Sequence, residues 1–310
     1  MTVRVRRATT RDAPAVRAAI VEAFLARPAL DPPSTAPQET DHSVREAIAT
    51  GGGLVAQLDG ELAGVALVAR EADVVTLRRV ATRPPYRRRG VASALAGEAE
   101  RLAAQAGARV LAVSARVELP DTIGFWLHRG YTQVGQRGHL VDLAKPVPLT
   151  VSLPDATATR ELGRRLAGVL RAGDLVVLTG DLGAGKTTLT QGIGAGLGVR
   201  GEVTSPTFVI ARVHPSLSGG PALVHVDAYR LTGALEVDDL DLDATLEDSV
   251  TVVEWGEGKV EGLAPDRLQV QLLATGDDSG REAVLRGLGR RWLAAADALA
   301  QAVTPREPGA

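Results

Sequence analysis

The 310-residue sequence predicts an α/β chain of two domains: a mixed α+β sheet domain, then an α/β domain with a parallel sheet. Three observations favour this fold class. The length suits two domains of ordinary size, and a 45% hydrophobic share can fill two cores. Short apolar strand patterns also alternate with amphipathic helical ones. Because Pro146 and Pro148 interrupt both patterns, we expect domains at 1–147 and 148–310.

Composition restricts the chemistry and the surroundings. The absence of cysteine excludes disulfides, zinc–thiolate sites and cysteine nucleophiles, and it favours the cytoplasm. No segment resembles a signal peptide or reaches the ~20 apolar residues of a membrane span, so no membrane contact is expected. Residues 1–148 contain 20 basic and 15 acidic residues, a net +5, and the remainder contains 15 and 22, a net −7. An acidic second domain is a poor direct ligand for nucleic acid.

In the first domain, period-2 and period-3.6 patterns predict the elements in order. The pair Asp59-Gly60 predicts a tight hairpin turn, because both residues tolerate positive φ. The stretch 27–40 contains four prolines and is expected to form a mobile surface loop. We expect strands over residues 3–7, 54–58, 61–68, 73–82 and 110–115, and helices over 12–25 and 90–105.

In the second domain, residues 174–179 form a short, almost wholly apolar segment that enters a glycine-rich turn. Such a strand suits a parallel sheet covered on both faces. Glycines at 192, 194, 196 and 198 are expected to fray the end of the helix that follows the turn. We expect further strands over 223–226 and 250–253, and helices over 157–170, 188–197 and 291–303.

The glycine-rich turn reads Gly-Asp-Leu-Gly-Ala-Gly-Lys-Thr and fits the pattern G-x-x-x-x-G-K-[ST] between a strand and a helix. Its glycines let successive backbone N–H groups point at the phosphates of a nucleotide, and the helix N-terminus adds partial positive charge. Lys186 supplies a mobile cation, and the hydroxyl of Thr187 can ligate Mg²⁺. The motif predicts an ATP site formed by Gly180, Asp181, Leu182, Gly183, Ala184, Gly185, Lys186, Thr187 and Thr188.

Alternatives to an ATP site are weaker. A ligand-free glycine turn is disfavoured because the chain has only three lysines, and one of them stands where the motif requires it. A dinucleotide fold is disfavoured because no G-x-G-x-x-G follows a strand. The guanine-specific Asn-Lys-x-Asp element and the arginine-rich lid of small-molecule kinases are both absent from the sequence.

Three further motifs follow the phosphate loop: Thr204-Ser205-Pro206-Thr207-Phe208, the segment His225 to Leu231, and Val253-Glu254-Trp255. Their order and spacing resemble the TsaE (YjeE) family, from about Leu149 to the C-terminal helix. The resemblance implies a Mg²⁺-ATP-dependent ATPase that binds the two-subunit tRNA threonylcarbamoyl transferase, of TsaB and TsaD type. That complex modifies adenosine 37 of tRNA to t6A, so tRNA would be contacted only indirectly.

Two carboxylates are candidate partners of the phosphate loop. Asp227 and Glu254 both end apolar strands, at the sheet edge that faces a bound ligand. In the family the Glu of Glu-Trp is linked to Mg²⁺, so the resemblance assigns Thr187 and Glu254 to the metal. Asp227 is then assigned to catalysis with Lys186, by activating water or by contacting the metal indirectly. The reverse assignment and a purely structural role for either acid are the alternatives.

Four weaker candidates complete the second domain. Thr204 to Thr207 resembles a switch segment that senses the γ-phosphate, with an ordinary Ser-Pro turn as the alternative. Thr159 and Arg281 match family positions near the nucleotide, although a lone Thr or Arg is more often structural. Trp255 is expected to pack rather than to take part in chemistry.

In the first domain, Arg87-Arg88-Arg89-Gly90-Val91-Ala92 follows a strand and opens a helix. Small residues there let amides approach a pyrophosphate, and arginines add charge-assisted hydrogen bonds. Together with the segments 77–82 and 125–131, this loop resembles the GNAT acetyltransferases over residues 3–143; a nonspecific basic loop is the alternative. The resemblance implies an acetyl-CoA site formed by Val80, Arg87, Arg88, Arg89, Gly90, Val91 and Ala92.

In the first domain, the sequence departs from the family's pattern at a catalytic position. Trp126 stands where GNAT enzymes often place the Tyr that protonates the departing thiolate, and indole is no general acid. His128 and Glu118 are candidate acid or base groups, with solvated surface roles as the alternative, and Tyr131 matches a packing position. The domain is therefore expected to be an N-acetyltransferase of unassigned acceptor. The alternatives are a catalytically silent CoA-binding sensor, or a chain that is chiefly an N-acetyltransferase with an accessory nucleotide-binding module.

Overall fold

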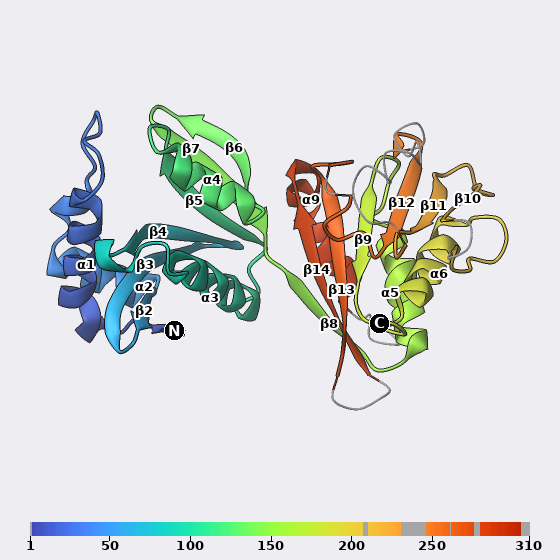
Figure 1. The fold of residues 1–310 in the computed structure, drawn as a ribbon, viewed down its shortest axis with the longest axis horizontal. Coiled ribbons are helices and arrows are strands. Elements are labelled where there is room, and N and C mark those ends of the chain that lie inside the picture. Colours follow the sequence, from blue (N-terminus) through green and yellow to red (C-terminus); the bar gives the residue numbers. More distant parts are fainter. Residues whose placement is uncertain (1, 207–209, 231–245, 261, 276–279, 305–310) are drawn as a thin grey trace. The chain divides into compact units, whose positions relative to one another are not determined.

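The structure is a computed structural model, and it describes residues 2–206, 210–230, 246–260, 262–275 and 280–304 (Figure 1). The contacts within the chain divide it into two compact units, Met1–Val147 and Pro148–Ala310. Each unit carries its own sheet and hydrophobic core. Among the described residues, no helix has the length and apolar character needed to cross a membrane.

The N-terminal unit is built on a seven-stranded mixed sheet with the order β1-β2-β3-β4-β5-β7-β6. All neighbouring strands are antiparallel except β4 and β5. The strands are β1 (Val3–Arg7), β2 (Gly53–Leu58), β3 (Glu61–Glu71), β4 (Val74–Thr82), β5 (Val110–Arg116), β6 (Thr132–Arg137) and β7 (Leu140–Pro146). The mixed sheet confirms the fold class predicted for this half.

Helices cover both faces of this sheet. On one face, α1 (Ala13–Leu25) and α2 (Asp41–Thr50) enclose a core with Val55 and Val65. On the other face, α3 (Val91–Gln105) and α4 (Pro120–His128) enclose a second core that includes Leu54 and Ala56. Because adjacent strand residues point to opposite faces, β2 contributes to both cores.

Two backbone features shape the middle of the sheet. The predicted hairpin turn between β2 and β3 is confirmed, since Asp59 and Gly60 have φ of 54° and 86°. The parallel pairing of β4 with β5 ends at Leu77 and Val113, although both strands continue. Just beyond this point Arg79 has a φ of 51°, next to an irregularity in the pairing of β3 with β4. The β4 backbone is therefore free of β5 from residue 78 onward.

The proline-rich stretch 27–40 was expected to be a mobile surface loop, but it contains regular structure and is bonded to the sheet. It includes the 3-10 helix η2 (Ala36–Gln38), whose first residue is fully buried. Arg79 Nε donates to Glu39 Oε1 at 2.8 Å, and Arg116 donates to the carbonyls of Asp31 and Pro32. These contacts fasten the stretch to β4 and β5.

The C-terminal unit has a seven-stranded sheet with the order β10-β11-β12-β9-β13-β14-β8. The four central strands β11, β12, β9 and β13 are parallel, whereas both edges are antiparallel. The predicted parallel sheet is thus confirmed only at its centre. The strands are β8 (Leu149–Leu153), β9 (Leu175–Thr179), β10 (Ala211–His214), β11 (Ala222–Asp227), β12 (Ser249–Glu254), β13 (Arg267–Ala274) and β14 (Arg281–Leu288).

Helices α5 (Ala156–Ala167), α6 (Lys186–Leu197) and α10 (Ala296–Val303) enclose the main core of this unit on one face of the sheet. The short α9 (Arg290–Ala294) adds the fully buried Trp292. The single C-terminal helix predicted over 291–303 was wrong, because the chain breaks at Ala295 and begins a second helix.

The prediction that glycines fray α6 was also wrong. The helix stays regular to Leu197 and ends at Gly198 with a φ of 66°. Its glycines let α5 approach closely, because a Cβ at Gly192 would collide with the Arg160 backbone, and one at Gly196 would lie 2.5 Å from Ala167 Cβ. Small residues therefore determine how tightly α5 and α6 pack.

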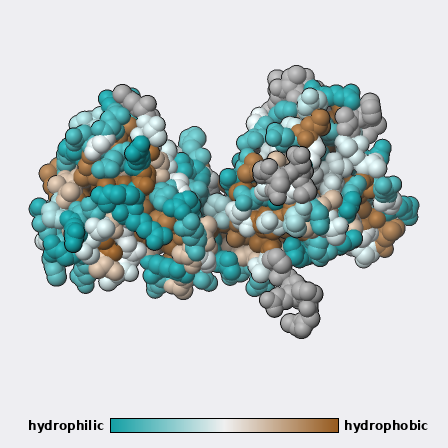
Figure 2. All heavy atoms as spheres, turned by 90° about the horizontal axis from the view of Figure 1, so that it is seen from below, coloured by the Kyte–Doolittle hydropathy of each residue, from teal (hydrophilic) through white to brown (hydrophobic). Residues whose placement is uncertain are grey.

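The surface has a different character from these cores. Figure 2 shows that hydrophilic residues cover most of the visible face of both units, and that hydrophobic ones form small patches. One exposed apolar side chain is Leu182, which is 92% exposed in the glycine-rich turn after β9. Leu182 therefore exposes a large apolar side chain within the predicted phosphate site.

Candidate functional site

The phosphate loop leaves the sheet at its centre. Strand β9 is buried from Leu175 to Leu178, between β12 and β13, and delivers the chain to the carboxyl edge of the parallel strands. Three glycines then adopt backbone conformations that other residues avoid, with φ of 142° at Gly180, 76° at Gly183 and 101° at Gly185. A Cβ at Gly180 would collide with the Leu272 carbonyl. The backbone of this cradle therefore requires glycine at these positions.

Lys186 lies inside the cradle and is almost fully buried. Its ammonium donates to the carbonyls of Gly180 and Asp181 at 2.8 and 2.9 Å. Burial lowers the pKa of Lys186, and the nearby carboxylates of Glu254, Asp227 and Asp181 oppose this effect. The ammonium is thus held at the loop by two carbonyls, where an incoming phosphate would offer it stronger charged partners.

Thr187 and Glu254 meet beside the first turn of α6. Thr187 Oγ1 donates to the Glu254 carboxylate, at 2.9 Å from Oε1 and 3.3 Å from Oε2. Glu254 ends β12, and in the parallel register its neighbour is Asp227 at the end of β11. The structure therefore brings the predicted hydroxyl and both predicted acids to one sheet edge. Hydroxyl and carboxylate oxygens are ligands that suit Mg²⁺.

Asp227 connects this edge to the expected switch segment. Its Oδ1 accepts the backbone N–H of Tyr229 at 3.1 Å, and its Oδ2 accepts Ser205 Oγ at 3.2 Å. Arg212 on β10 donates to Thr204 Oγ1 at 2.9 Å. Thr207 and Phe208 of this segment, like Leu231 of the next motif, lie outside the described residues.

Thr159 and Arg281 both lie at the loop. Thr159 on α5 is buried, and its methyl carbon lies 3.7 Å from the position of a Cβ on Gly185. Arg281, the first residue of β14, places Nη2 3.5 Å from the Gly183 carbonyl. Distant parts of the chain thus converge on the glycines. Within the loop itself Ala184 is buried, whereas Asp181 and Leu182 are exposed and Thr188 is half-buried.

Trp255 does more than pack, which the sequence did not predict. Its indole lies over the Lys186 ammonium, 3.7 Å from Nζ to the ring centroid, and its edge contacts the Tyr229 ring. Its φ of 61° is uncommon for an aromatic residue and costs backbone strain. A cavity of ≈ 530 Å³ lies beside the loop and is lined by both aromatic residues, Lys259 and Gly180.

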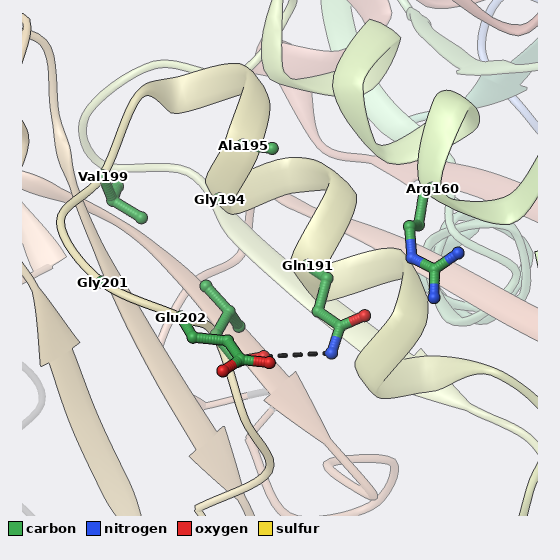
Figure 3. Close-up of a pocket in the computed structure, with 8 residues that line it drawn as sticks. Arg160, Gln191, Gly194, Ala195, Val199, Gly201 and Glu202 are labelled. Carbon is green, nitrogen blue, oxygen red and sulfur yellow. Dashed lines mark hydrogen bonds between the residues drawn. The ribbon is translucent and has the colours of Figure 1, made fainter. Parts of the chain in front are cut away.

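A second hollow, of ≈ 380 Å³, lies on the exposed side of α6 (Figure 3). Gln191 on α6 donates to the Val203 carbonyl at 3.1 Å, which ties the helix to the start of the switch segment. Arg160 and Glu202 lie on opposite sides of the hollow. This hollow does not include the phosphate loop.

His225 is the polar group at the site that sequence reasoning missed, although it stands within a motif quoted for the family resemblance. The ring is fully buried on β11, and Nε2 lies 2.9 Å from Glu254 Oε1. The signal in the sequence was a histidine in a strand of otherwise apolar residues, two positions before Asp227.

The second candidate site, in the N-terminal unit, lies where β4 turns into α3. Gly90 caps α3 with a φ of 78°, so no side chain caps the first turn of this helix. Arg87 donates to the Ala23 carbonyl at 3.2 Å, and Arg88 and Arg89 are exposed beside it. Arg27 lies 3.4 Å from the carbonyl of Val80 on the unpaired part of β4. Open amides and arginines at a helix N-terminus suit a phosphate-bearing ligand; Val91 is buried below them and Ala92 is half-buried.

The side chains discussed for catalysis in this unit are engaged in aromatic packing or in local hydrogen bonds. Trp126 is 2% exposed and stacks edge-on with Phe125 and Tyr131. Burial raises the pKa of Tyr131. His128 Nδ1 lies 2.6 Å from a carbonyl of its own helix. The hydrogen bond from Arg116 lowers the pKa of Glu118 to about 2, which makes this carboxylate a weak base.

Comparison with known proteins divides the chain in the same way. Residues 153–283 match the family model of the threonylcarbamoyl adenosine biosynthesis protein TsaE, and residues 20–131 match that of the acetyltransferase (GNAT) family. The tRNA threonylcarbamoyladenosine biosynthesis protein TsaE of Streptomyces coelicolor is 69% identical over 140 residues, which cover 44% of this chain and 95% of that protein.

Two solved structures resemble separate halves of the chain. The crystal structure of Bacillus subtilis YdiB is 32% identical, with a TM-score of 0.42 and coverage of 50% of this chain and 95% of that one. The PaiA N-acetyltransferase of Thermoplasma acidophilum, crystallised with coenzyme A, is 16% identical. Its TM-score is 0.43, and the match covers 47% of this chain and 99% of that one.

Proposed function

The chain belongs to the TsaE family of threonylcarbamoyl adenosine biosynthesis proteins, and from this premise we propose that its C-terminal unit is a Mg²⁺-dependent ATPase of tRNA t6A37 formation. The observation that carries the proposal is the contact of Thr187 with Glu254 beside an ammonium held in a glycine cradle. Hydroxyl, carboxylate and ammonium are the groups that a Mg²⁺-triphosphate needs around it.

The residues divide the work by position. The loop amides and Lys186 would hold the β- and γ-phosphates, and Lys186 would exchange its two carbonyl partners for phosphate oxygens. Thr187 and Glu254 would hold Mg²⁺, which neutralises charge that develops on the phosphates. Asp227 lies beside Glu254 at the strand ends, where it would orient or deprotonate the attacking water.

Replacing Lys186 with alanine tests the site. Lys186→Ala removes the only ammonium in the cradle among the described residues and is expected to weaken ATP binding by at least about a hundredfold. Isothermal titration of the full chain with ATP and Mg²⁺ measures this, with urea unfolding of the C-terminal unit as the control for folding. Unchanged ATP affinity in this variant would refute the assignment of the phosphate site.

The partner is proposed to be a two-subunit threonylcarbamoyl transferase of TsaB and TsaD type, which would hold the tRNA. The charge balance supports an indirect contact, because the C-terminal half has a net charge of −7 and RNA backbones bind clustered cations. We expect ATP hydrolysis to rise when the partner subunits are added and tRNA alone to have no effect. Stimulation by tRNA without the partners would contradict this arrangement.

The N-terminal unit is proposed to bind acetyl-CoA, as its GNAT family match supports, and to transfer the acetyl group to an amine. Arg87 would contact the pyrophosphate. Arg87→Ala is expected to weaken CoA binding roughly tenfold, the effect of losing one charge-assisted hydrogen bond. Arg4→Ala, an exposed arginine on β1, is the matched control. Equal CoA affinity of both variants would argue against this loop as the binding site.

Burial of Trp126 favours a second candidate function for this unit, a sensor that binds acetyl-CoA without turning it over. An indole inside an aromatic stack cannot donate a proton to a thiolate. The sensor predicts that acetyl-CoA changes the rate of ATP hydrolysis and is recovered intact. Consumption of acetyl-CoA in the presence of a panel of amines would instead favour the acetyltransferase.

A further inference from the structure

His225 occupies a place in the C-terminal core that would ordinarily suit an apolar side chain. Its side chain points to the same face of the sheet as Leu223 on its own strand and Val252 on β12, and both of these are fully buried. A polar ring in such a core needs a hydrogen-bond partner to offset the loss of water. The partner here is Glu254, at 2.9 Å.

The register of the sheet explains how the two side chains meet. In the parallel pairing of β11 and β12, His225 lies opposite Val252, and Glu254 follows two residues later on the same face. The two side chains are therefore diagonal neighbours, a separation that a long side chain and an imidazole ring can bridge. The contact is a product of the sheet and does not depend on a loop.

The hydrogen bond has a defined direction. A carboxylate can only accept, so Nε2 of His225 carries the proton and donates it to Oε1. Among the described residues, Nδ1 is buried and has no hydrogen-bond partner. The ring thus directs its single interaction at Glu254, and it does so from a position without solvent.

Glu254 Oε1 accepts two hydrogen bonds, one from His225 and one from Thr187. Under the proposed function, the two donors differ in whether they would also ligate Mg²⁺. Thr187 can ligate Mg²⁺ through an oxygen lone pair while its proton stays on the carboxylate, so this donor would itself be part of the metal site. His225 approaches the carboxylate from the core of the sheet and would not ligate the metal. Among the described residues, His225 is thus the donor that fixes the carboxylate without being a candidate ligand of the metal.

We propose that His225 is a positioning residue for the metal site, which holds the Glu254 carboxylate in the orientation that receives Mg²⁺. This inference rests on the proposed function of the C-terminal unit. Partners of metal ligands typically change metal affinity by about ten- to a hundredfold when they are removed. His225 would therefore set the Mg²⁺ requirement of nucleotide binding, without contacting metal or nucleotide.

The test measures nucleotide binding to the full chain over a range of Mg²⁺ concentrations and in excess EDTA. His225→Leu keeps an apolar core and removes the donor. It is expected to raise the Mg²⁺ concentration at half-saturation by about ten- to a hundredfold, while the nucleotide affinity in EDTA stays that of the wild type. His214→Leu is the matched control, since His214 is a buried histidine of neighbouring β10 that makes no hydrogen bond to Glu254 in the described part of the chain.

Two further variants keep the inference testable if His225→Leu does not fold. His225→Gln can place its amide nitrogen near the position of Nε2, so it should retain most of the wild-type Mg²⁺ dependence, whereas the shorter His225→Asn should not. Equal Mg²⁺ half-saturation for these two variants, or wild-type half-saturation in a folded His225→Leu, would overturn the inference. A wild-type chain that binds nucleotide with no dependence on Mg²⁺ would instead refute the proposed function itself.

Discussion

The two units use the same backbone device and surround it with different chemistry. In each, a strand delivers the chain to a loop that ends in a left-handed glycine, Gly185 before α6 and Gly90 before α3. Each loop leaves the first amides of a helix open to an anion. At α6 these amides adjoin a buried ammonium and a buried carboxylate, whereas at α3 they adjoin exposed arginines.

The difference shows which part of a phosphate site carries information about function. Open amides bind phosphates of any kind, so the loop alone predicts only a class of ligand. The buried groups Lys186, Glu254 and His225 have lost their water and are oriented by fixed neighbours, as a site for chemistry requires. The first turn of α3 adjoins exposed arginines, and the buried Trp126 of α4 is no general acid.

The largest expected effect separates the two acids at the strand ends. Glu254→Gln removes a negative charge but retains the shape of the side chain, so it should raise the Mg²⁺ concentration for half-maximal ATPase activity by at least about a hundredfold. Asp227→Asn should lower the maximal rate and leave the Mg²⁺ requirement unchanged. The measurement is ATP hydrolysis against Mg²⁺ concentration. A reversed pattern would assign the metal to Asp227.

A second effect compares helix glycines in the two units. At Gly192 in α6 an added Cβ would collide with the Arg160 backbone, so Gly192→Ala should destabilise the C-terminal unit by about 1–3 kcal/mol. At Gly124 in α4 nothing lies within 4 Å of an added Cβ, so Gly124→Ala should stabilise by about 0.5–1 kcal/mol through helix propensity. Urea unfolding of both variants checks the signs. If Gly192→Ala were as stable as the wild type, α5 and α6 could move apart with little loss of folding free energy.

Local patterns predicted the elements that carry the phosphate loop. The strand β9 and the helix α6 follow directly from apolar runs and a glycine motif, and Asp227 and Glu254 were correctly expected at strand ends. The antiparallel edges of this sheet were not predicted, because β8, β10 and β14, like β13, were not identified as strands, and a single sequence does not reveal which strand pairs with which. Helix α2 was missed because its first turn is polar and follows a proline-rich stretch.

Sequence patterns did not predict the contacts that complete the site. The approach of α5 to α6 depends on glycines that local propensity reads as helix-breaking. The contact of Trp255 with Lys186 joins residues far apart in the chain through an unusual φ at Trp255. The bond between His225 and Glu254 arises from sheet register, which a single sequence does not specify.

The smallest expected effect concerns acid stability of the N-terminal unit. Asp12 accepts from Arg6 at 2.7 and 2.8 Å and from the backbone of Thr9, and the hydrogen bond from Arg6 holds the pKa of Asp12 well below its usual range. Because the folded-state pKa is depressed, this stabilisation is complete above the unfolded pKa of about 3.9 and is lost as the pH falls below it. At neutral pH it is worth about 1 kcal/mol, since the pair lies at the surface.

Asp12→Asn should therefore lower stability at pH 7 and lower it less at about pH 2, where the carboxyl of the unfolded chain is protonated. Urea unfolding at both pH values measures the gap between the two proteins. Asp73→Asn is the control, because the exposed Asp73 side chain makes no hydrogen bond or ion pair among the described residues. A gap that stays constant with pH would mean that Asp12 acts through packing at the start of α1, and its charge would then contribute nothing to the difference between the units.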